Sequence, residues 1–253
     1  MDLVYNLVDF FFMNNNEDKI YNQIKRKKNK IIFDVGSFKG KFTEKILKLD
    51  KNKLNTKYYL FDPNPNGLSY IKELKKKNKG IQYNCIGLDN KIKKKVFHLN
   101  KFFEASGSSF QTILKNDRSW NSSRRKLLNI FNIFSKKKLE NFEKILVSTN
   151  TIDNFCKDKK IKMIDLLKID AEGHEEFILK GSIKLLRENK INVVYVEVLS
   201  QKNNFNYKKK KIKNYLEKYN LKFIKEYPIK SVGILSNLKS SDLLFINQNY
   251  NCE

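Results

Sequence analysis

The chain has 253 residues, of which 40% are hydrophobic, and it contains 19 Phe and 12 Tyr. This length and composition predict one packed globular domain over residues 1–253 and exclude a disordered chain. The formal net charge is +25, but only five of the 52 basic residues are arginine, the residue that reads bases and forks onto phosphates. We therefore do not expect nucleic acid or an anionic membrane surface to be the main partner.

The cysteines and the first residues bear on the cellular compartment. Cys85, Cys156 and Cys252 have no paired spacing, so we expect neither a disulfide framework nor a zinc site. A reducing, cytoplasmic compartment fits this pattern. Residues 1–13 contain an apolar run but no basic leader, and the run is too short to span a bilayer. We expect an N-terminal helical extension over residues 1–29 and no transmembrane segment.

Strand-like and helix-like segments alternate along the chain, which predicts a parallel sheet with crossover helices. The expected strands are short apolar runs, typical of strands buried on both faces, at 31–35, 58–61, 80–86, 164–169 and 193–198. The expected helices between them have apolar residues at helical spacing and lie at 42–49, 68–74 and 175–188.

The carboxyl-terminal part, residues 201–253, is predicted to form a helix over 207–219 and two strands over 221–226 and 243–247. No helical pattern separates these strands, which favours an antiparallel hairpin at the sheet edge.

The region from residue 89 to 147 is the least regular part of the chain. Residues 94–99 are expected to add a strand, and residues 126–142 look helical. The lysine runs are interpreted as solvated faces; they lie at 75–77, 93–95, 136–138 and 208–211.

The first strand turns through Gly36 and Gly40 into a helix. Glycine allows positive φ and close approach of a ligand, while the helix start offers free N–H groups to an anion. The G-x-x-x-G spacing differs from the G-x-G-x-x-G of dinucleotide folds. Phe42 stands where a phosphate loop has Ser or Thr, so a phosphate cradle is disfavoured.

Two acids next to this turn restrict the class of ligand that we expect it to bind. Asp34 would repel a polyphosphate but pair with an ammonium group. Asp62 ends the second strand, where ribose hydroxyls are held in doubly wound folds, although it could simply form a turn before Pro63. S-adenosylmethionine has an ammonium, a carboxylate and a sulfonium, and no phosphate. The expected cofactor contacts are Asp34, Gly36, Ser37, Gly40, Asp62 and Asp89.

A second cluster of acids follows the strand at 164–169. Asp170 and Glu172 lie at its carboxyl end, and Glu197 could bring a third carboxylate to the same edge. Such acids could remove a proton from a hydroxyl, hold a divalent cation or bind substrate hydroxyls. His174 could act as a base or as an orienting group. The acids at 175 and 176 are interpreted as favourable partners of the helix dipole.

Three of the five arginines, Arg118, Arg124 and Arg125, lie near Trp120 in the irregular region. They predict either a lid that recognises an anionic acceptor or a solvated helix start.

At these residues the chain resembles the FkbM family of methyltransferases. The matching blocks are Phe33-Asp34-Val35-Gly36 with Gly40, Phe61-Asp62-Pro63-Asn64-Pro65, Thr151-Ile152-Asp153-Asn154-Phe155, and Leu167 to Glu175 with Leu179-Lys180-Gly181. They cover a core at residues 30–200. The chain departs from the family at Asp62, where Glu is more common, at Ser37-Phe38 in the turn, and in an inserted substrate-side segment at 103–146.

The resemblance implies a class I Rossmann-like α/β fold, with a mostly parallel seven-stranded sheet and a carboxyl-terminal antiparallel hairpin. It also implies S-adenosylmethionine as cofactor and methyl transfer to a hydroxyl of a sugar, glycan or secondary metabolite. The alternatives are an RNA or protein methyltransferase, favoured by the basic charge, and a catalytically inactive module that binds S-adenosylmethionine.

On this hypothesis Asp170 is the first choice for the base, followed by His174 and Glu172. The acceptor is expected to be a small molecule or glycan that contacts Glu197, Arg124 and Arg125. A divalent cation could be bridged by the three carboxylates but is not expected, and no metal ligand is assigned.

Overall fold

The computed structural model describes residues 16–51, 53–100, 108–110, 142–228 and 238–250. Its centre is a seven-stranded sheet in the order β3-β2-β1-β7-β8-β10-β9. The strands are β1 (Ile31–Val35), β2 (Lys57–Phe61), β3 (Ile81–Asn84), β7 (Ile164–Ile169), β8 (Ile191–Gln201), β9 (Leu221–Pro228) and β10 (Leu238–Asn247). Strand β10 runs antiparallel to both β8 and β9, whereas the other neighbouring pairs are parallel. The predicted mostly parallel sheet with a carboxyl-terminal hairpin is confirmed.

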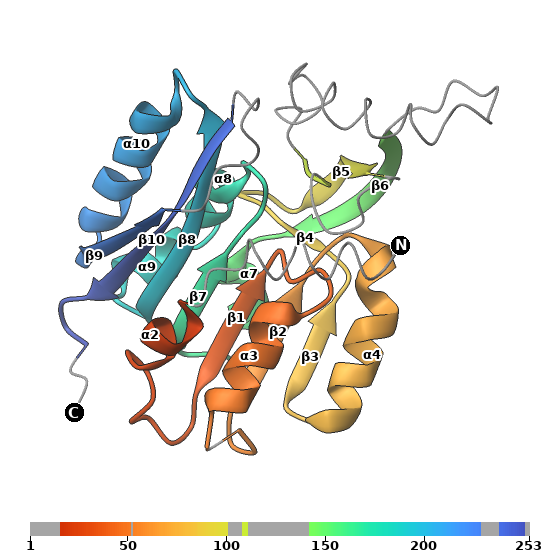
Figure 1. Ribbon diagram of the computed structural model, residues 1–253, viewed down its shortest axis with the longest axis vertical. Coiled ribbons are helices and arrows are strands. Elements are labelled where there is room, and N and C mark those ends of the chain that lie inside the picture. Colours follow the sequence, from red (N-terminus) through yellow and green to blue (C-terminus); the bar gives the residue numbers. More distant parts are fainter. Residues whose placement is uncertain (1–15, 52, 101–107, 111–141, 229–237, 251–253) are drawn as a thin grey trace.

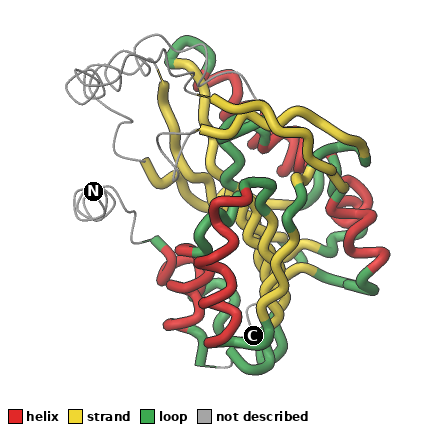
Figure 2. The backbone as a smooth tube through the Cα atoms, turned by 90° about the vertical axis from the view of Figure 1, so that its right-hand side faces the viewer, coloured by secondary structure: helices red, strands yellow, loops and turns green. Residues whose placement is uncertain are grey.

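Helices cover both faces of this sheet (Figures 1 and 2). One face packs against α2 (Glu17–Tyr21), α3 (Lys41–Leu49) and α4 (Leu68–Lys77). The other face packs against α7 (Ile152–Asp158), α8 (Glu175–Lys180), α9 (Ile183–Arg187) and α10 (Phe205–Glu217). A 3₁₀ turn, η1 (Pro65–Gly67), precedes α4. Every residue of β7 is buried, which explains why the parallel strands are continuous apolar runs in the sequence.

The helix expected over 175–188 is divided into α8 and α9 at Gly181. A Cβ atom at this position would lie 2.2 Å from the carbonyl oxygen of Asp89. Gly181 therefore lets the end of α8 pack directly against the backbone near Asp89, and the single-helix prediction is wrong here.

A second sheet has the order β4-β6-β5 and lies beyond the carboxyl ends of the parallel strands (Figure 1). Its strands are β4 (Gly87–Leu88), β5 (Lys93–Asn100) and β6 (Phe142–Asn150). The strand predicted at 94–99 is confirmed as β5. The helix predicted at 126–142 is wrong at its last residue, which begins β6, and its other residues lie outside the described ranges.

The opposite edge of the main sheet, at the amino ends of its strands, contains a buried acid. Asp50 accepts hydrogen bonds from Tyr21, Lys30, Thr56 and Tyr58, at 2.6–3.0 Å. The side chains of Asp50 and Lys30 are both fully buried. A buried carboxylate is tolerated when its charge and lone pairs are matched in this way, so the cluster fastens α2 and the loops before β1 and β2 to the sheet.

Replacing Asp50 with alanine leaves the buried Lys30 ammonium without its carboxylate. We expect the free energy of unfolding, measured by urea denaturation, to fall by about 3–5 kcal/mol. Asp18→Ala, at an exposed position of α2, serves as the control and should change it by less than about 1 kcal/mol. A loss as small as that of the control would contradict this account of the cluster.

Candidate functional site

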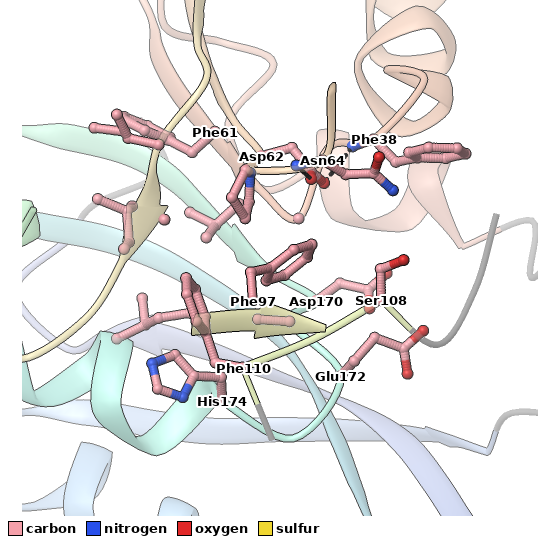
Figure 3. Close-up of a pocket in the computed structure, with 18 residues that line it drawn as sticks. Phe38, Phe61, Asp62, Asn64, Phe97, Ser108, Phe110, Asp170, Glu172 and His174 are labelled. Atoms are coloured by element: carbon pink, nitrogen blue, oxygen red, sulfur yellow. Dashed lines mark hydrogen bonds between the residues drawn. The ribbon is translucent and has the colours of Figure 1, made fainter. Parts of the chain in front are cut away.

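A cleft lies between the carboxyl edge of the main sheet and the small sheet. Figure 3 shows Phe61, Asp62 and Asn64 on one side of this cleft, and Phe97 and Phe110 on the other. Five residues predicted for the site line it: Gly36, Asp62, Asp170, Glu172 and His174.

Gly36 is required because two strand ends approach each other closely. Its φ is +75°, and a Cβ atom would lie 1.7 Å from the carbonyl oxygen of Asp170. Gly40, also at φ +75°, is the N-cap residue of α3. A Cβ atom there would lie within 2.9 Å of the side chains of Ile71 and Leu74, so Gly40 lets α3 pack against α4. The first glycine shapes the cleft, and the second serves helix packing.

The amide groups of the turn already have acceptors in the protein. Gly36 and Ser37 donate to the carbonyl of Phe61, at 2.9 and 3.2 Å, and Gly40 donates to the carbonyl of Ser37. Phe38 donates to Asp62. The amides of the turn itself are therefore satisfied within the protein, and the expectation of free N–H groups at the start of α3 stays a prediction.

Asp62 forms the turn that its sequence context predicts as one of two roles, and its contact with ribose hydroxyls stays a prediction. Its Oδ2 accepts from the amide of Phe38 and its Oδ1 from the amide of Asn64, both at 2.8 Å. Burial raises the pKa of Asp62 to about 6, although both amide bonds oppose this rise. A carboxylate has further lone pairs, so Asp62 can shape the turn and still accept hydrogen bonds from hydroxyls in the cleft.

Asp34, in contrast, is fully buried and is not one of the residues that line the cleft. Its Oδ2 accepts from the Thr43 hydroxyl at 2.8 Å, and its Oδ1 lies 3.1 Å from Nζ of Lys168. The cation next to Asp34 is therefore a lysine of the chain, whereas we expected the ammonium of a ligand. Such a partner is needed because an unpaired buried carboxylate is costly.

Lys168 was not singled out in the sequence, although a lysine inside a buried apolar strand is a clear signal. Its Nζ lies 3.2 Å from the carbonyl oxygen of Gly36 and 3.5 Å from Oδ2 of Asp170. Burial alone would lower the pKa of Lys168, but the carboxylates of Asp34 and Asp170 raise it above its ordinary value. Lys168 therefore remains charged below the cleft.

The three acids expected at this edge do come together. Burial, followed by the negative charges of Asp170 and Glu172, raises the pKa of Glu197 well above its ordinary value. Glu197 is hydrogen-bonded to Asp170, whose side chain is 44% exposed. Asp242 of β10 is the cross-strand neighbour of Glu197 and adds a further negative charge. This arrangement favours a proton on Glu197 that is shared with the Asp170 carboxylate.

His174 lines the cleft with a fully buried ring, and Asp89 holds it from below. Its Nε2 lies 3.3 Å from Oδ1 of Asp89, and Lys95 contacts Oδ2 of the same acid at 3.0 Å. The ring stacks on Phe177 at 4.8 Å. Burial, then the charge of Lys95, lowers the pKa of His174 to about 4. Nζ of Lys95 lies 3.5 Å from the same Nε2, and the neutral tautomer with its proton on Nε2 is the one that can donate to Asp89, which does not line the cleft.

Two lysines from the runs interpreted as solvated faces are instead part of this framework, so that interpretation is wrong for Lys95 and Lys208. The Lys208 ammonium lies 2.9 Å from Glu175 and donates to the carbonyls of Gly173 and Leu199. Glu175 also accepts from the amide of Gly173 at 2.6 Å. This acid therefore fastens the turn that precedes α8, in addition to lying in its first helical turn.

Some predictions concern residues that are not described. Arg118, Trp120, Arg124 and Arg125 lie outside the described ranges, so the lid stays a prediction. Within the described part of the chain, no group of three or more His, Cys, Asp and Glu side chains could hold a metal ion. No helix in that part is long and apolar enough to cross a membrane.

Comparison with known proteins gives one family match. The sequence model described as "Methyltransferase FkbM domain" matches residues 34–223. No curated protein shows a significant match.

Similar solved structures include the N-methyltransferase NodS from Bradyrhizobium japonicum WM9 in complex with S-adenosyl-L-homocysteine, with a TM-score of 0.44 and 8% identity over 92% of this chain and 86% of that chain. The precorrin-6y C5,15-methyltransferase from Geobacter metallireducens GS-15 has a TM-score of 0.44 and 10% identity over 94% and 91%. TYW2 from M. jannaschii, in complex with AdoMet, has a TM-score of 0.42 and 15% identity over 92% and 76%.

The lowered pKa of His174 predicts a pH-dependent stability. The unfolded chain binds a proton at this residue below pH 6.5, whereas the folded chain resists protonation down to about pH 4. The stabilisation is therefore complete above pH 6.5 and is lost as the pH falls towards 4, by at most about 1.4 kcal/mol per pH unit. The His174→Gln variant should lose less stability over this window, as measured by urea denaturation at several pH values.

The difference between the wild type and His174→Gln reports the effect of His174 protonation alone, because the raised pKa of Asp62 affects the stability of both proteins equally. Parallel stability curves for His174→Gln and the wild type would show that the buried ring accepts a proton as readily as the unfolded chain does.

Proposed function

The chain belongs to the FkbM methyltransferase domain family, and from this premise we propose that it methylates a hydroxyl of a sugar, glycan or secondary metabolite. One observation carries the choice of a hydroxyl acceptor. The hydrogen-bonded carboxyl pair of Asp170 and Glu197 stands at the edge of the cleft and can take up a proton. An alcohol needs such a base, because it is a poor nucleophile until its proton leaves.

The residues of the cleft fit S-adenosylmethionine as cofactor. Asp62 offers carboxylate lone pairs to ribose hydroxyls, and Gly36 leaves the turn open next to it. Ser37 is buried, and its hydroxyl has no hydrogen-bond partner among the described residues, which suits a polar ligand at this turn. When bound, the cofactor supplies an electrophilic methyl group on a sulfonium.

Asp170 is the proposed base. Its side chain is 44% exposed, and it lies above Lys168 and next to Glu197. Glu197 donates a hydrogen bond to it and so fixes its orientation, while Glu172 lines the same side of the cleft. We propose that Asp170 accepts the hydroxyl proton, and that Glu172 and Glu197 bind neighbouring hydroxyls of the acceptor.

The remaining predicted residues receive supporting roles in this proposal. Nε2 of His174 already donates to Asp89, which argues against that nitrogen as the base, so His174 forms part of the cleft wall. Asp34 and Gly40 support the turn from below. Asp89 acts on the cleft through His174, and we propose that it makes no direct contact with the cofactor.

The local charge favours this reading over the RNA alternative. A chain with a net charge of +25 places two acids, Asp170 and Glu172, in the lining of the cleft, with Glu197 and Asp242 behind them. Carboxylates at the acceptor side repel a phosphate backbone, whereas they bind neutral hydroxyls well. Because Asp170 is engaged by Glu197 and Lys168, we propose that the reaction needs no divalent cation.

An Asp170→Asn variant tests the role of the base. Its side chain keeps the shape but loses the proton acceptor, so we expect methyl transfer to fall by about 10²–10⁴-fold while cofactor affinity changes little. Transfer is measured with a labelled methyl group across a panel of sugars, glycans and hydroxylated metabolites. Ser182→Ala, on the far side of α8, is the control for a buried substitution outside the cleft.

A loss of cofactor affinity in Asp170→Asn would instead make Asp170 a binding residue. Transfer to RNA or protein, but to no hydroxylated small molecule, would refute the proposed acceptor class. Cofactor binding without transfer to any member of the panel would favour the inactive module. Loss of wild-type transfer in excess chelator would overturn the metal-free reaction.

A further inference from the structure

Lys168 connects the glycine turn after β1 with Asp170 after β7. The role that we infer for it rests on the proposed methyl transfer. We propose that Lys168 is a positioning residue, which fixes the cofactor turn relative to Asp170 and holds Asp170 as the charged member of its pair with Glu197.

The ammonium of Lys168 contacts both β1 with its turn and Asp170. From β7 its ammonium reaches back to β1, where it contacts Oδ1 of Asp34 at 3.1 Å and the carbonyl oxygen of Gly36 at 3.2 Å. It also faces Oδ2 of Asp170 at 3.5 Å. The backbone carbonyl of Asp170 in turn lies where a Cβ atom of Gly36 would be. The position of the turn and that of Asp170 are therefore fixed by one side chain.

The surroundings show why the charge of this residue matters. The side chain of Lys168 is only 8% exposed, and the ring of Phe42 from α3 lies 5.7 Å from its ammonium. Acids approach it from both neighbouring strands, Asp34 of β1 and Glu197 of β8, and from Asp170 after β7. Glu172 and Asp242 in turn lie near Glu197. Tyr195, the neighbour of Lys168 on β8, is hydrogen-bonded to Asp242.

In this acidic group the position of the ammonium decides which carboxyl keeps a proton. Nζ of Lys168 lies 3.5 Å from Oδ2 of Asp170, and in the described part of the chain no ion pair joins Lys168 to Glu197. An adjacent cation favours the carboxylate form, and a neighbouring carboxylate disfavours it. The proton of the pair therefore stays on Glu197, and the ammonium of Lys168 lies next to Asp170, which faces the acceptor hydroxyl in the proposed reaction.

A buried lysine elsewhere in the chain provides the matched control. Lys30 is also fully buried and pairs with a single carboxylate, Asp50, at 3.0 Å. This pair lies at the amino edge of the sheet, away from the cleft. Lys30→Met and Lys168→Met therefore both remove a buried charge of the same kind, but only Lys168→Met removes it from the proposed site.

The test follows the carboxyl groups of Asp170 and Glu197 by carbon NMR as the pH is changed, with Glu197→Gln to assign the signals. In the Lys168→Met variant we expect Glu197 to ionise about 1–3 pH units higher than in the wild type. We also expect affinity for S-adenosylhomocysteine to fall by about tenfold or more, because the carbonyl of Gly36 loses a charged partner. Lys30→Met should change neither quantity.

An unchanged ionisation of Glu197 in folded Lys168→Met would overturn the proposal, as would an equal shift in Lys30→Met. The wild type gives an independent check if Lys168→Met does not fold. At neutral pH its Glu197 should be a carboxylic acid, and an ionised Glu197 would overturn the proposal. Failure of the wild type to bind S-adenosylhomocysteine would count against the proposed function, whereas the titration would still report on Lys168.

Discussion

The ammonium of Lys168 is the interaction on which the geometry of the cleft depends. It is a buried charge inside a strand of apolar residues, and such a charge is stable only when opposite charges and polar atoms surround it. Asp34, the carbonyl of Gly36 and Asp170 meet this requirement and so bring the ends of β1 and β7 together. The glycine turn then has no space for a side chain.

Two further ion pairs, each between a partly exposed lysine and a fully buried acid, lie next to the cleft. Asp89 pairs with Lys95 beneath the His174 ring, and Glu175 pairs with Lys208 beside the turn before α8. The first pair lies within one short segment, whereas the second joins residues 33 positions apart in the chain, and both buried acids lie below the surface of the cleft. Its lining remains open for apolar and hydroxyl contacts, which a nucleoside cofactor and a polyhydroxyl acceptor both require.

The sequence predicts the parallel sheet and the edge at which the acids meet, because strands buried on both faces are continuous apolar runs and their carboxyl ends share one edge. It does not predict β6, whose run Phe142–Asn150 mixes charged and apolar residues and depends on pairing with β5. The partners of Asp34 and Lys208 also could not be predicted. In a chain with 52 basic residues, a buried lysine looks like its many exposed neighbours until the fold brings an acid to it.

The most direct test of the central claim is a crystal structure of the protein with S-adenosylhomocysteine. The account predicts that the adenosyl group lies in the cleft between Asp62 and Phe97, with the amino acid end near Gly36 and Asp170 (Figure 3). Lys168 should keep its contacts with Asp34 and Asp170. A ligand bound outside this cleft, or an empty cleft at saturating ligand, would contradict the account.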